Sequence, residues 1–169
     1  IYKEKNGLHH WRNTTASGFA NPRTTYADGE NPFLMGTARM ARTVQREDKQ
    51  SEIAFIPQIK NDGEKAVYVC YQTLPESTDN AQYTVYHKGQ ATTISVNQRM
   101  GGGTWVYLGT FDFGKGCSEN NCVVLNNLCT KDGMVTADAV RFGGGMGNIH
   151  RGGNISGMPR ALEGARYAA

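Results

Sequence analysis

The chain has 169 residues, a formal net charge of +3 and 21 glycines. This length suits one domain with a real core, and so many glycines favour short strands and turns over a helical bundle. The lysines and arginines form no basic block, and no apolar run approaches the roughly 20 residues of a membrane span, so we expect no nucleic-acid partner and no membrane span.

The first twelve residues read as an edge strand or as the start of the domain. They end in His9, His10 and Trp11. Neighbouring residues of a strand point to opposite faces, so the two histidines are poorly placed to bind one metal ion together. Residues 14–32 contain glycines and prolines but few apolar side chains, which predicts a long loop.

Alternation of apolar and polar residues predicts strands over 36–44, 53–59, 65–72, 122–125 and 134–142. Turn signals separate them, among them Asn61-Asp62-Gly63 and Lys131-Asp132-Gly133. With the central strands described next, we count about eight strands and no βαβ alternation. The sequence therefore predicts an all-β domain in which two antiparallel sheets face each other.

The central stretch, residues 83–116, predicts three consecutive strands. The turn at Gly89-Gln90 joins the first to the second, and Gly101-Gly102-Gly103 supplies the backbone freedom for the next turn. The third strand, residues 104–113, is rich in aromatic and β-branched residues, which suit a pleated surface. We interpret the three strands as a meander on which the rest of the chain packs.

A β-bulge is expected inside the third of these strands. If Val106 and Leu108 face a core, strict alternation sends Phe111 and Phe113 into solvent. One extra residue at Gly109 restores the register, so that all four side chains face inward. Trp105 and Tyr107 then lie on the opposite face.

The aromatic residues are the main candidates for a functional site. The chain has more aromatic residues than the expected core requires, and flat rings with polar tips stack on sugars or anchor partner proteins. The candidates are Trp105, Tyr107, Tyr86 and Trp11. Each ring taken singly can instead serve packing. Both interpretations stay open at the level of the sequence.

Cysteines and acidic residues give weaker signals. Cys117 and Cys122 flank a polar loop short enough for a disulfide. The spacing fits a zinc site poorly, so we expect structural cysteines, either free or paired. Asp138 is expected to make a structural hydrogen bond, with a structural calcium ion as the alternative. The sequence has no Gly-x-Ser-x-Gly motif for a catalytic serine. Asp112 and Asp138 are the candidates for a carboxylate pair, but aspartates on strands are more often surface or turn-bonding groups, so we expect no catalytic residues.

The composition changes after Phe142. Residues 143–153 contain six glycines, and Pro159 begins a short helix that Ser156 can cap. The glycine run lacks the helix of a dinucleotide loop and the Gly-Lys-Ser/Thr ending of a nucleotide-binding loop. We expect residues 1–142 to form the sandwich, and residues 143–169 to form a linker and the start of a helix that belongs to the parent protein.

A family resemblance emerges from the segment AQYTVYHKGQATTISVNQRMGGGTWVYLGTFDF together with GMVTADAVRF. Both closely resemble the golvesin C-terminal-like domain, also called the xanthan-lyase carbohydrate-binding-like domain. VYVCYQTLPES and NPFLMGTARMA look like its earlier strands, so the resemblance spans roughly residues 11–142.

The resemblance implies a jelly-roll β-sandwich of the galactose-binding-like type, outside the cytoplasm: secreted, periplasmic or on the cell surface of a bacterium. Such a domain is an accessory module without activity or cofactor of its own, with a glycan as partner. The flanking GGGMGNIHRGG and SGMPRALEGARYAA resemble secreted N-acetylmuramoyl-L-alanine amidases of Bacteroidota, in which the sandwich is inserted. The hydrolase domain of the same chain is then a second partner, and a purely structural role that positions this domain is the alternative to sugar binding.

Overall fold

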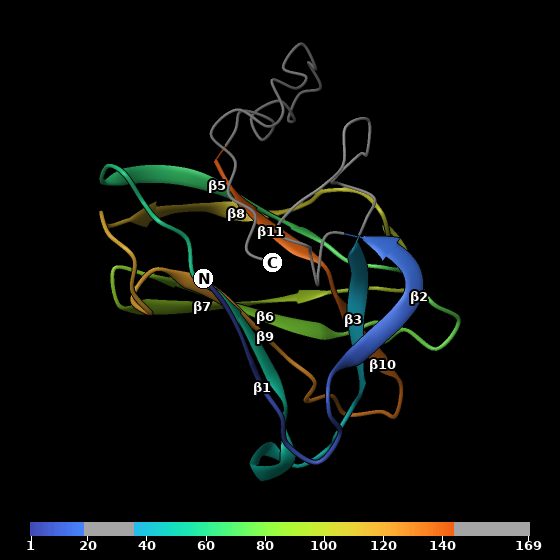
Figure 1. Ribbon diagram of the computed structural model, residues 1–169. Helices are drawn as coiled ribbons and strands as arrows, with labels where there is room; N and C mark the ends of the chain where they lie inside the picture. The colour runs from blue at the N-terminus through green and yellow to red at the C-terminus, as the bar shows by residue number, and fades with distance from the viewer. Residues whose placement is uncertain (19–35, 144–169) are drawn as a thin grey trace.

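The computed structural model describes residues 1–18 and 36–143 of the chain (Figure 1). Nearly all regular structure in these residues is β-strand, apart from a single 3₁₀ turn at Glu47–Lys49. The strands are β1 (Tyr2–Lys5), β2 (Arg12–Gly18), β3 (Gly36–Arg42), β4 (Glu52–Phe55), β5 (Gly63–Cys70), β6 (Ala81–His87), β7 (Gln90–Val96), β8 (Val106–Phe113), β9 (Cys122–Asn126), β10 (Met134–Ala137) and β11 (Ala139–Phe142).

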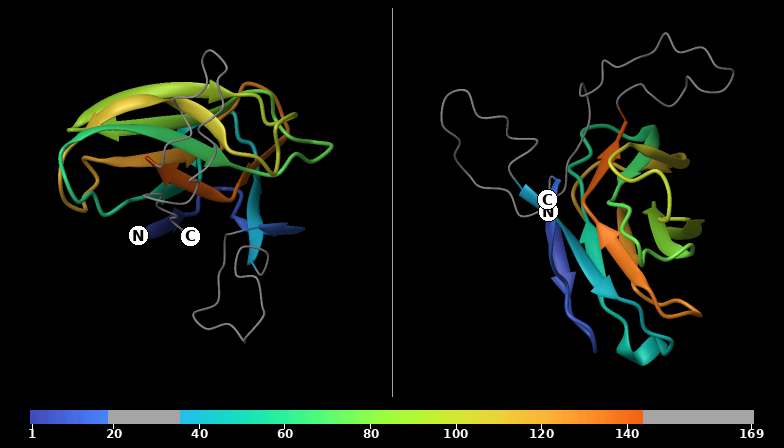
Figure 2. Two further views of the ribbon diagram at one scale, coloured as in Figure 1. Left: turned by 90° about the horizontal axis from the view of Figure 1, so that it is seen from above. Right: turned by 90° about the vertical axis from the view of Figure 1, so that its right-hand side faces the viewer.

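The strands form two layers. One layer is a five-stranded sheet with the order β1-β4-β9-β6-β7, and the other consists of the three-stranded sheets β10-β3-β2 and β11-β5-β8. Figures 1 and 2 show the β11-β5-β8 sheet lying over β9, β6 and β7. All strand pairs are antiparallel, which confirms the predicted jelly-roll sandwich.

One continuous segment, residues 134–142, joins the two smaller sheets. Its first half pairs with β3 and its second half with β5. The segment was expected to be one strand, but it divides at Asp138, whose backbone N–H donates to the Cys70 carbonyl at 3.1 Å. The two small sheets are therefore connected through one continuous stretch of chain.

The core lies between the layers and is built from the inward face of each strand. Val67 and Val69 of β5, Tyr83 and Val85 of β6, and Leu125 of β9 are all buried. The predicted alternation of β5 and β6 is therefore confirmed. β6 buries every second residue from Ala81 to Val85, whereas the second half of β5 is buried on both faces.

A buried amide links the two layers. The Gln98 side chain donates to the Tyr83 hydroxyl at 3.0 Å and to the Thr136 carbonyl at 2.8 Å, and its oxygen accepts from the Thr136 N–H at 2.9 Å. Gln98 is 0% exposed, so each of these bonds replaces one with water. A buried amide with satisfied partners fixes a single relative position of the two layers.

Two predicted features of the topology are wrong. The hairpin of β6 and β7 is present, with φ values of 51° at Lys88 and 80° at Gly89 in its turn, but β8 pairs with β5 in the opposite layer. The expected meander therefore has two strands, because the glycine-rich loop crosses between layers. Residues 12–18, which were expected mostly as loop, form β2. The predicted C-terminal helix lies outside the described residues.

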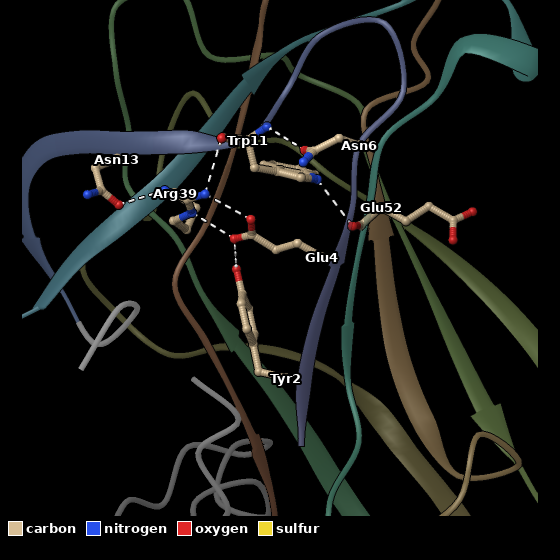
Figure 3. Close-up of polar contacts among 7 residues, drawn as sticks. All are labelled: Tyr2, Glu4, Asn6, Trp11, Asn13, Arg39 and Glu52. Atoms are coloured by element: carbon tan, nitrogen blue, oxygen red, sulfur yellow. Dashed lines mark hydrogen bonds and ion pairs between the residues drawn. The ribbon is translucent and has the colours of Figure 1, made fainter. Parts of the chain in front are cut away.

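An ion pair closes the open side of the sandwich (Figure 3). Arg39 of β3 donates from Nε to Glu4 Oε2 at 2.7 Å and from Nη2 to Glu4 Oε1 at 2.8 Å, across the two layers. The same guanidinium donates to Asn13 Oδ1 at 2.7 Å and to the Trp11 carbonyl at 3.1 Å. Each partner of the pair keeps only 19% of its side chain exposed, so the pair is better shielded than surface pairs of this protein.

The ion pair changes the titration of its acidic partner. Burial alone raises the pKa of the Glu4 carboxyl, but the hydrogen bonds from Arg39 and Tyr2 and the charge of Arg39 outweigh it and lower this pKa below its ordinary value of 4.5. A carboxyl whose pKa is lower in the folded state stabilises that state above its unfolded pKa. The contribution is lost as pH falls through the folded value.

Glu4→Gln should reduce the free energy of unfolding at neutral pH by about 2 kcal/mol, because it leaves a half-buried guanidinium without its charged partner. The variant should also show a weaker loss of stability than the wild type when the pH falls below 4.5, the ordinary pKa of this carboxyl. Urea denaturation followed by circular dichroism at several pH values measures both effects.

Asp132→Asn is the matched control, because Asp132 pairs with Arg42 at the surface with side-chain exposures of 71% and 41%. Exposed pairs contribute about 0–1 kcal/mol. Equal destabilisation by the two substitutions would show that the Glu4 pair is no more than a surface contact.

Candidate functional site

The outer face of the β11-β5-β8 sheet gathers aromatic side chains. Cross-strand pairing places Arg141 of β11 opposite Tyr68 of β5, and Tyr68 opposite Tyr107 of β8. Trp105 stands two residues before Tyr107, on the same face. Val67, Val69 and Phe142 point the other way into the core, so this row lies on the outside of the sandwich.

The rings contact one another and one guanidinium. The ring centroids of Tyr68 and Tyr107 are 5.5 Å apart with planes inclined by 46°. The Arg141 guanidinium carbon lies 5.6 Å from the Tyr68 centroid and 5.9 Å from the Trp105 centroid, within range of cation–π attraction. Contacts on both sides hold the Tyr68 ring in place beside Tyr107.

Exposure differs along this row. Tyr107 is 45% exposed, Trp105 is half-buried, and Tyr68 and Arg141 are buried at 3% and 0%. The Tyr107 hydroxyl lies 2.6 Å from the Thr110 hydroxyl. We name Tyr68, Trp105, Tyr107 and Arg141 the aromatic row, of which Tyr107 offers most surface to a ligand.

The Tyr68 hydroxyl is polar, buried and without a hydrogen-bond partner among the described residues. Burial raises the pKa of this phenol, with Arg141 opposing and Tyr107 adding to the effect, so the hydroxyl stays protonated. Because the hydroxyl is buried, it presents no surface to a ligand, and the row offers ligands its rings instead. A buried hydroxyl without a partner costs about 1–3 kcal/mol.

A β-bulge positions the row. Val67 pairs with Gly109, but Tyr68 pairs with Tyr107, so Leu108 is the extra residue. Gly109 has φ 149°, and a Cβ there would approach the Phe111 ring at 3.0 Å. As predicted, Val106, Leu108, Phe111 and Phe113 pack on the core while Tyr107 faces outward.

The other two predicted aromatic candidates lie elsewhere. Tyr86 is half-buried on the outer face of the five-stranded sheet, in the opposite layer. Trp11 is only 4% exposed, and its indole N–H donates to the Glu52 carbonyl at 3.1 Å. Trp11 is therefore a core residue, and of the four candidates only Trp105 and Tyr107 come together at one surface.

Sequence reasoning did not single out Tyr68 or Arg141. Tyr68 belongs to the outward face of a predicted strand, a signal that was present in the alternation. Its proximity to Tyr107 depends on the pairing of β5 with β8, which the alternation does not specify. Arg141 lies between two buried residues of β11, and nothing in its local sequence indicates the ring contacts.

The predicted disulfide is not formed. Cys117 is an exposed free thiol, while Cys122 is buried at the start of β9 and donates to the Glu119 carbonyl at 3.4 Å. The buried thiol points into the turn toward Glu119. Burial, reinforced by the Glu119 charge, raises the pKa of Cys122 to about 11, so this thiol is unreactive at neutral pH.

The two aspartates singled out in the sequence each make a hydrogen bond within the domain. Asp138 accepts a hydrogen bond from the Cys70 thiol at 3.8 Å, and Asp112 accepts one from Lys88 at 3.0 Å on the surface. Within residues 1–18 and 36–143, no group of three or more His, Cys, Asp or Glu side chains could hold a metal ion. No helix in the same residues is long and apolar enough to cross a membrane.

A polar hollow of about 250 Å³ lies beside the loop that leads to Trp105. Its lining includes Arg42, Glu76, Arg99 and Asp132, of which Arg42 already pairs with Asp132. The charges partly balance and no aromatic ring lines the hollow. The aromatic row and this hollow are therefore chemically different surfaces.

Comparison with known proteins assigns the chain to a family. The sequence model of the golvesin C-terminal domain matches residues 11–144. This chain belongs to the golvesin C-terminal domain family. The match confirms the resemblance noted in the sequence, for the domain itself.

Two xanthan lyases contain a similar region. The enzyme of Bacillus sp. (strain GL1) is 33% identical over 90 residues, which are 53% of this chain and 10% of that protein. The solved structure of a Paenibacillus xanthan lyase matches with a TM-score of 0.60 and 22% identity, over 83% of this chain and 12% of that one. This golvesin C-terminal domain chain spans about a tenth of the length of either lyase.

Gly109→Ala should destabilise the domain and disturb the aromatic row, because its φ disfavours an L side chain and the new Cβ meets the Phe111 ring. Gly63→Ala is a matched control, since Gly63 has φ 144° but no atom within 4 Å of an added Cβ. We expect Gly109→Ala to lower the free energy of unfolding by about 1 kcal/mol more than Gly63→Ala. Equal losses in thermal denaturation would mean that the bulge tolerates the contact.

Proposed function

We propose that this golvesin C-terminal domain is a non-catalytic glycan-binding module and that the aromatic row is its contact surface. The observation that carries the proposal is the exposed Tyr107 ring, held beside Tyr68 on the outer face of the sheet. Rigid aromatic rings at a surface bury large area on a ligand at a low cost in conformational entropy. A pyranose face is a ligand of this shape.

The proposal extends to the parent protein. Similarity to segments of enzymes named for a polysaccharide, xanthan, supports a role beside a carbohydrate-active or cell-wall hydrolase. We propose that the parent is secreted or displayed at a bacterial surface. The flanking segments favour a parent of the N-acetylmuramoyl-L-alanine amidase type from Bacteroidota, whose hydrolase domain would be the partner of this module.

Tyr107→Ala should weaken binding to the recognised polysaccharide by about tenfold, because it removes a ring contact worth about 1 kcal/mol or more. Affinity electrophoresis through gels containing xanthan or soluble peptidoglycan fragments measures the retardation. Tyr86→Ala is the control, since it removes a half-buried Tyr from the outer face of the opposite layer. No retardation of the wild type by any acidic or neutral polysaccharide would contradict the proposal, as would equal losses in both variants.

Tyr68→Phe sharpens the test. The variant should be more stable than the wild type, since an unpartnered polar group is removed. It should bind the polysaccharide as well as the wild type does, since the buried hydroxyl presents no surface to a ligand. Unchanged binding with higher stability would leave Tyr107 and Trp105 as the contact. Isothermal titration and thermal denaturation separate the two effects.

A structural role is the second candidate, and one observation favours it. The family match begins at residue 11, yet β1 lies before it, completes the five-stranded sheet and supplies Glu4 to the pair with Arg39. The chain preceding the family region is thus bonded into the sandwich, as expected for a domain that holds a neighbour in place.

If this second role holds, deletion of residues 11–142 from the parent should lower its soluble yield and its thermal stability, and the isolated module should bind no polysaccharide. Expression of the two parent forms side by side, with the gel assay on the isolated module, decides between the roles. Retained parent stability together with retardation of the module would favour glycan binding.

A further inference from the structure

The four strands at the ends of the two layers differ in how they are protected. Unpaired strand edges invite pairing with another chain, and natural proteins usually protect them with charges, prolines or bulges. β1 carries Lys3, Glu4 and Lys5, and β8 carries Asp112 and the bulge at Gly109. β2 carries Arg12 and an irregular register with β3.

β7 has none of these protections. Its sequence, QATTISV, contains no charged residue and no proline, and its register with β6 is continuous over all seven residues. Ala91, Thr93 and Ser95 are exposed, and β6 is the only strand to which β7 pairs among the described residues.

The hairpin geometry fixes which backbone groups of β7 face outward. In a two-residue hairpin the pair that closes the turn, His87 with Gln90, exchanges hydrogen bonds, and every second pair after it does the same. The backbone groups of Thr92, Ile94 and Val96 therefore point to β6. The N–H and C=O groups of Ala91, Thr93 and Ser95 point away from the sheet.

We propose that β7 is a self-association edge, at which a second copy of this chain adds its own β7 in antiparallel orientation. Thr93 would lie on the two-fold axis, directly opposite Thr93 of the second copy. Ala91 of each copy would then pair with Ser95 of the other, and about six backbone hydrogen bonds would form. The two five-stranded sheets would become one continuous sheet.

The absence of charge on β7 favours a second copy as the occupant. Antiparallel pairing of β7 with itself places no like charges opposite each other, because the strand has none. The other end strands of a second copy carry the charges and irregular registers described above. The edge that best matches β7 on this chain is therefore β7 itself, and the proposal is independent of sugar binding.

Thr93→Lys tests the proposal, because it places two ammonium groups across the axis at the spacing of neighbouring strands, about 5 Å. We expect the self-association to weaken by about tenfold. Thr84→Lys is the matched control: Thr84 faces Thr93 on β6, on the same face, but two copies of it would be separated by three strand spacings, about 14 Å, more than a Debye length.

Thr93→Pro removes the outward N–H without removing a bond to β6, and it should abolish the association. Sedimentation equilibrium over a wide concentration range measures all four proteins, with circular dichroism melting to show that they are folded. A wild type that is monomeric at every concentration, or a dimer insensitive to both Thr93 variants, overturns the proposal.

Amide hydrogen exchange of the wild type gives a second measurement that needs no variant. The Ala91, Thr93 and Ser95 amides should exchange fast when dilute and become protected as the concentration rises. Concentration-independent exchange at these three amides, with an association detected elsewhere, would assign the contact to another surface and overturn the proposal.

Discussion

The bulge at Leu108 and Gly109 decides which aromatic residues of β8 face solvent. A side-chain period of two means that one inserted residue reverses the orientation of everything beyond it. Without it, the strand would expose Phe111 and Phe113 or bury Tyr107. With it, two phenylalanines complete the core and Tyr107 remains outside beside Tyr68. The core and the candidate surface are therefore two consequences of one backbone irregularity.

Polar contacts between the two layers fix the position of one layer relative to the other. The amide of Gln98 joins Tyr83 of one layer to Thr136 of the other, and the ion pair of Glu4 and Arg39 closes the far side (Figure 3). Apolar packing alone would tolerate small sliding of two sheets, since it is non-directional. Buried hydrogen bonds tolerate much less, because a shifted donor leaves an unsatisfied group on each side.

Several parts of the structure could be predicted from the sequence for physical reasons. Strands buried on one face carry their period in the residues themselves, so β5, β6 and β7 were evident, and so was the conflict in β8 that required a bulge. Strand partners were not evident, because alternation says which face is buried but not which strand lies alongside. For this reason β8 was placed beside β7, and the contact of Tyr68 with Tyr107 was missed.

Burial of single residues depends on the same long-range information. Trp11 and Tyr107 are both aromatic residues, yet one is 4% and the other 45% exposed. The Trp11 indole lies at the start of β4, where the Glu52 carbonyl accepts its N–H, and this position buries it. Likewise the spacing of Cys117 and Cys122 permits a disulfide, but the turn directs the buried thiol toward Glu119.

The aromatic row and the β7 edge lie on different layers, and their geometry makes the two proposed roles compatible. A two-fold axis that relates antiparallel edge strands is perpendicular to the merged sheet, so each face of that sheet is conserved across the axis. The second layers of both copies then lie on the same side, and both Tyr107 rings point in the same direction. A long polysaccharide could contact both rings at once, and the second contact would be intramolecular. Weak binding by a single shallow row of rings would in this way become effective on a repeating polymer while remaining weak for a short oligosaccharide.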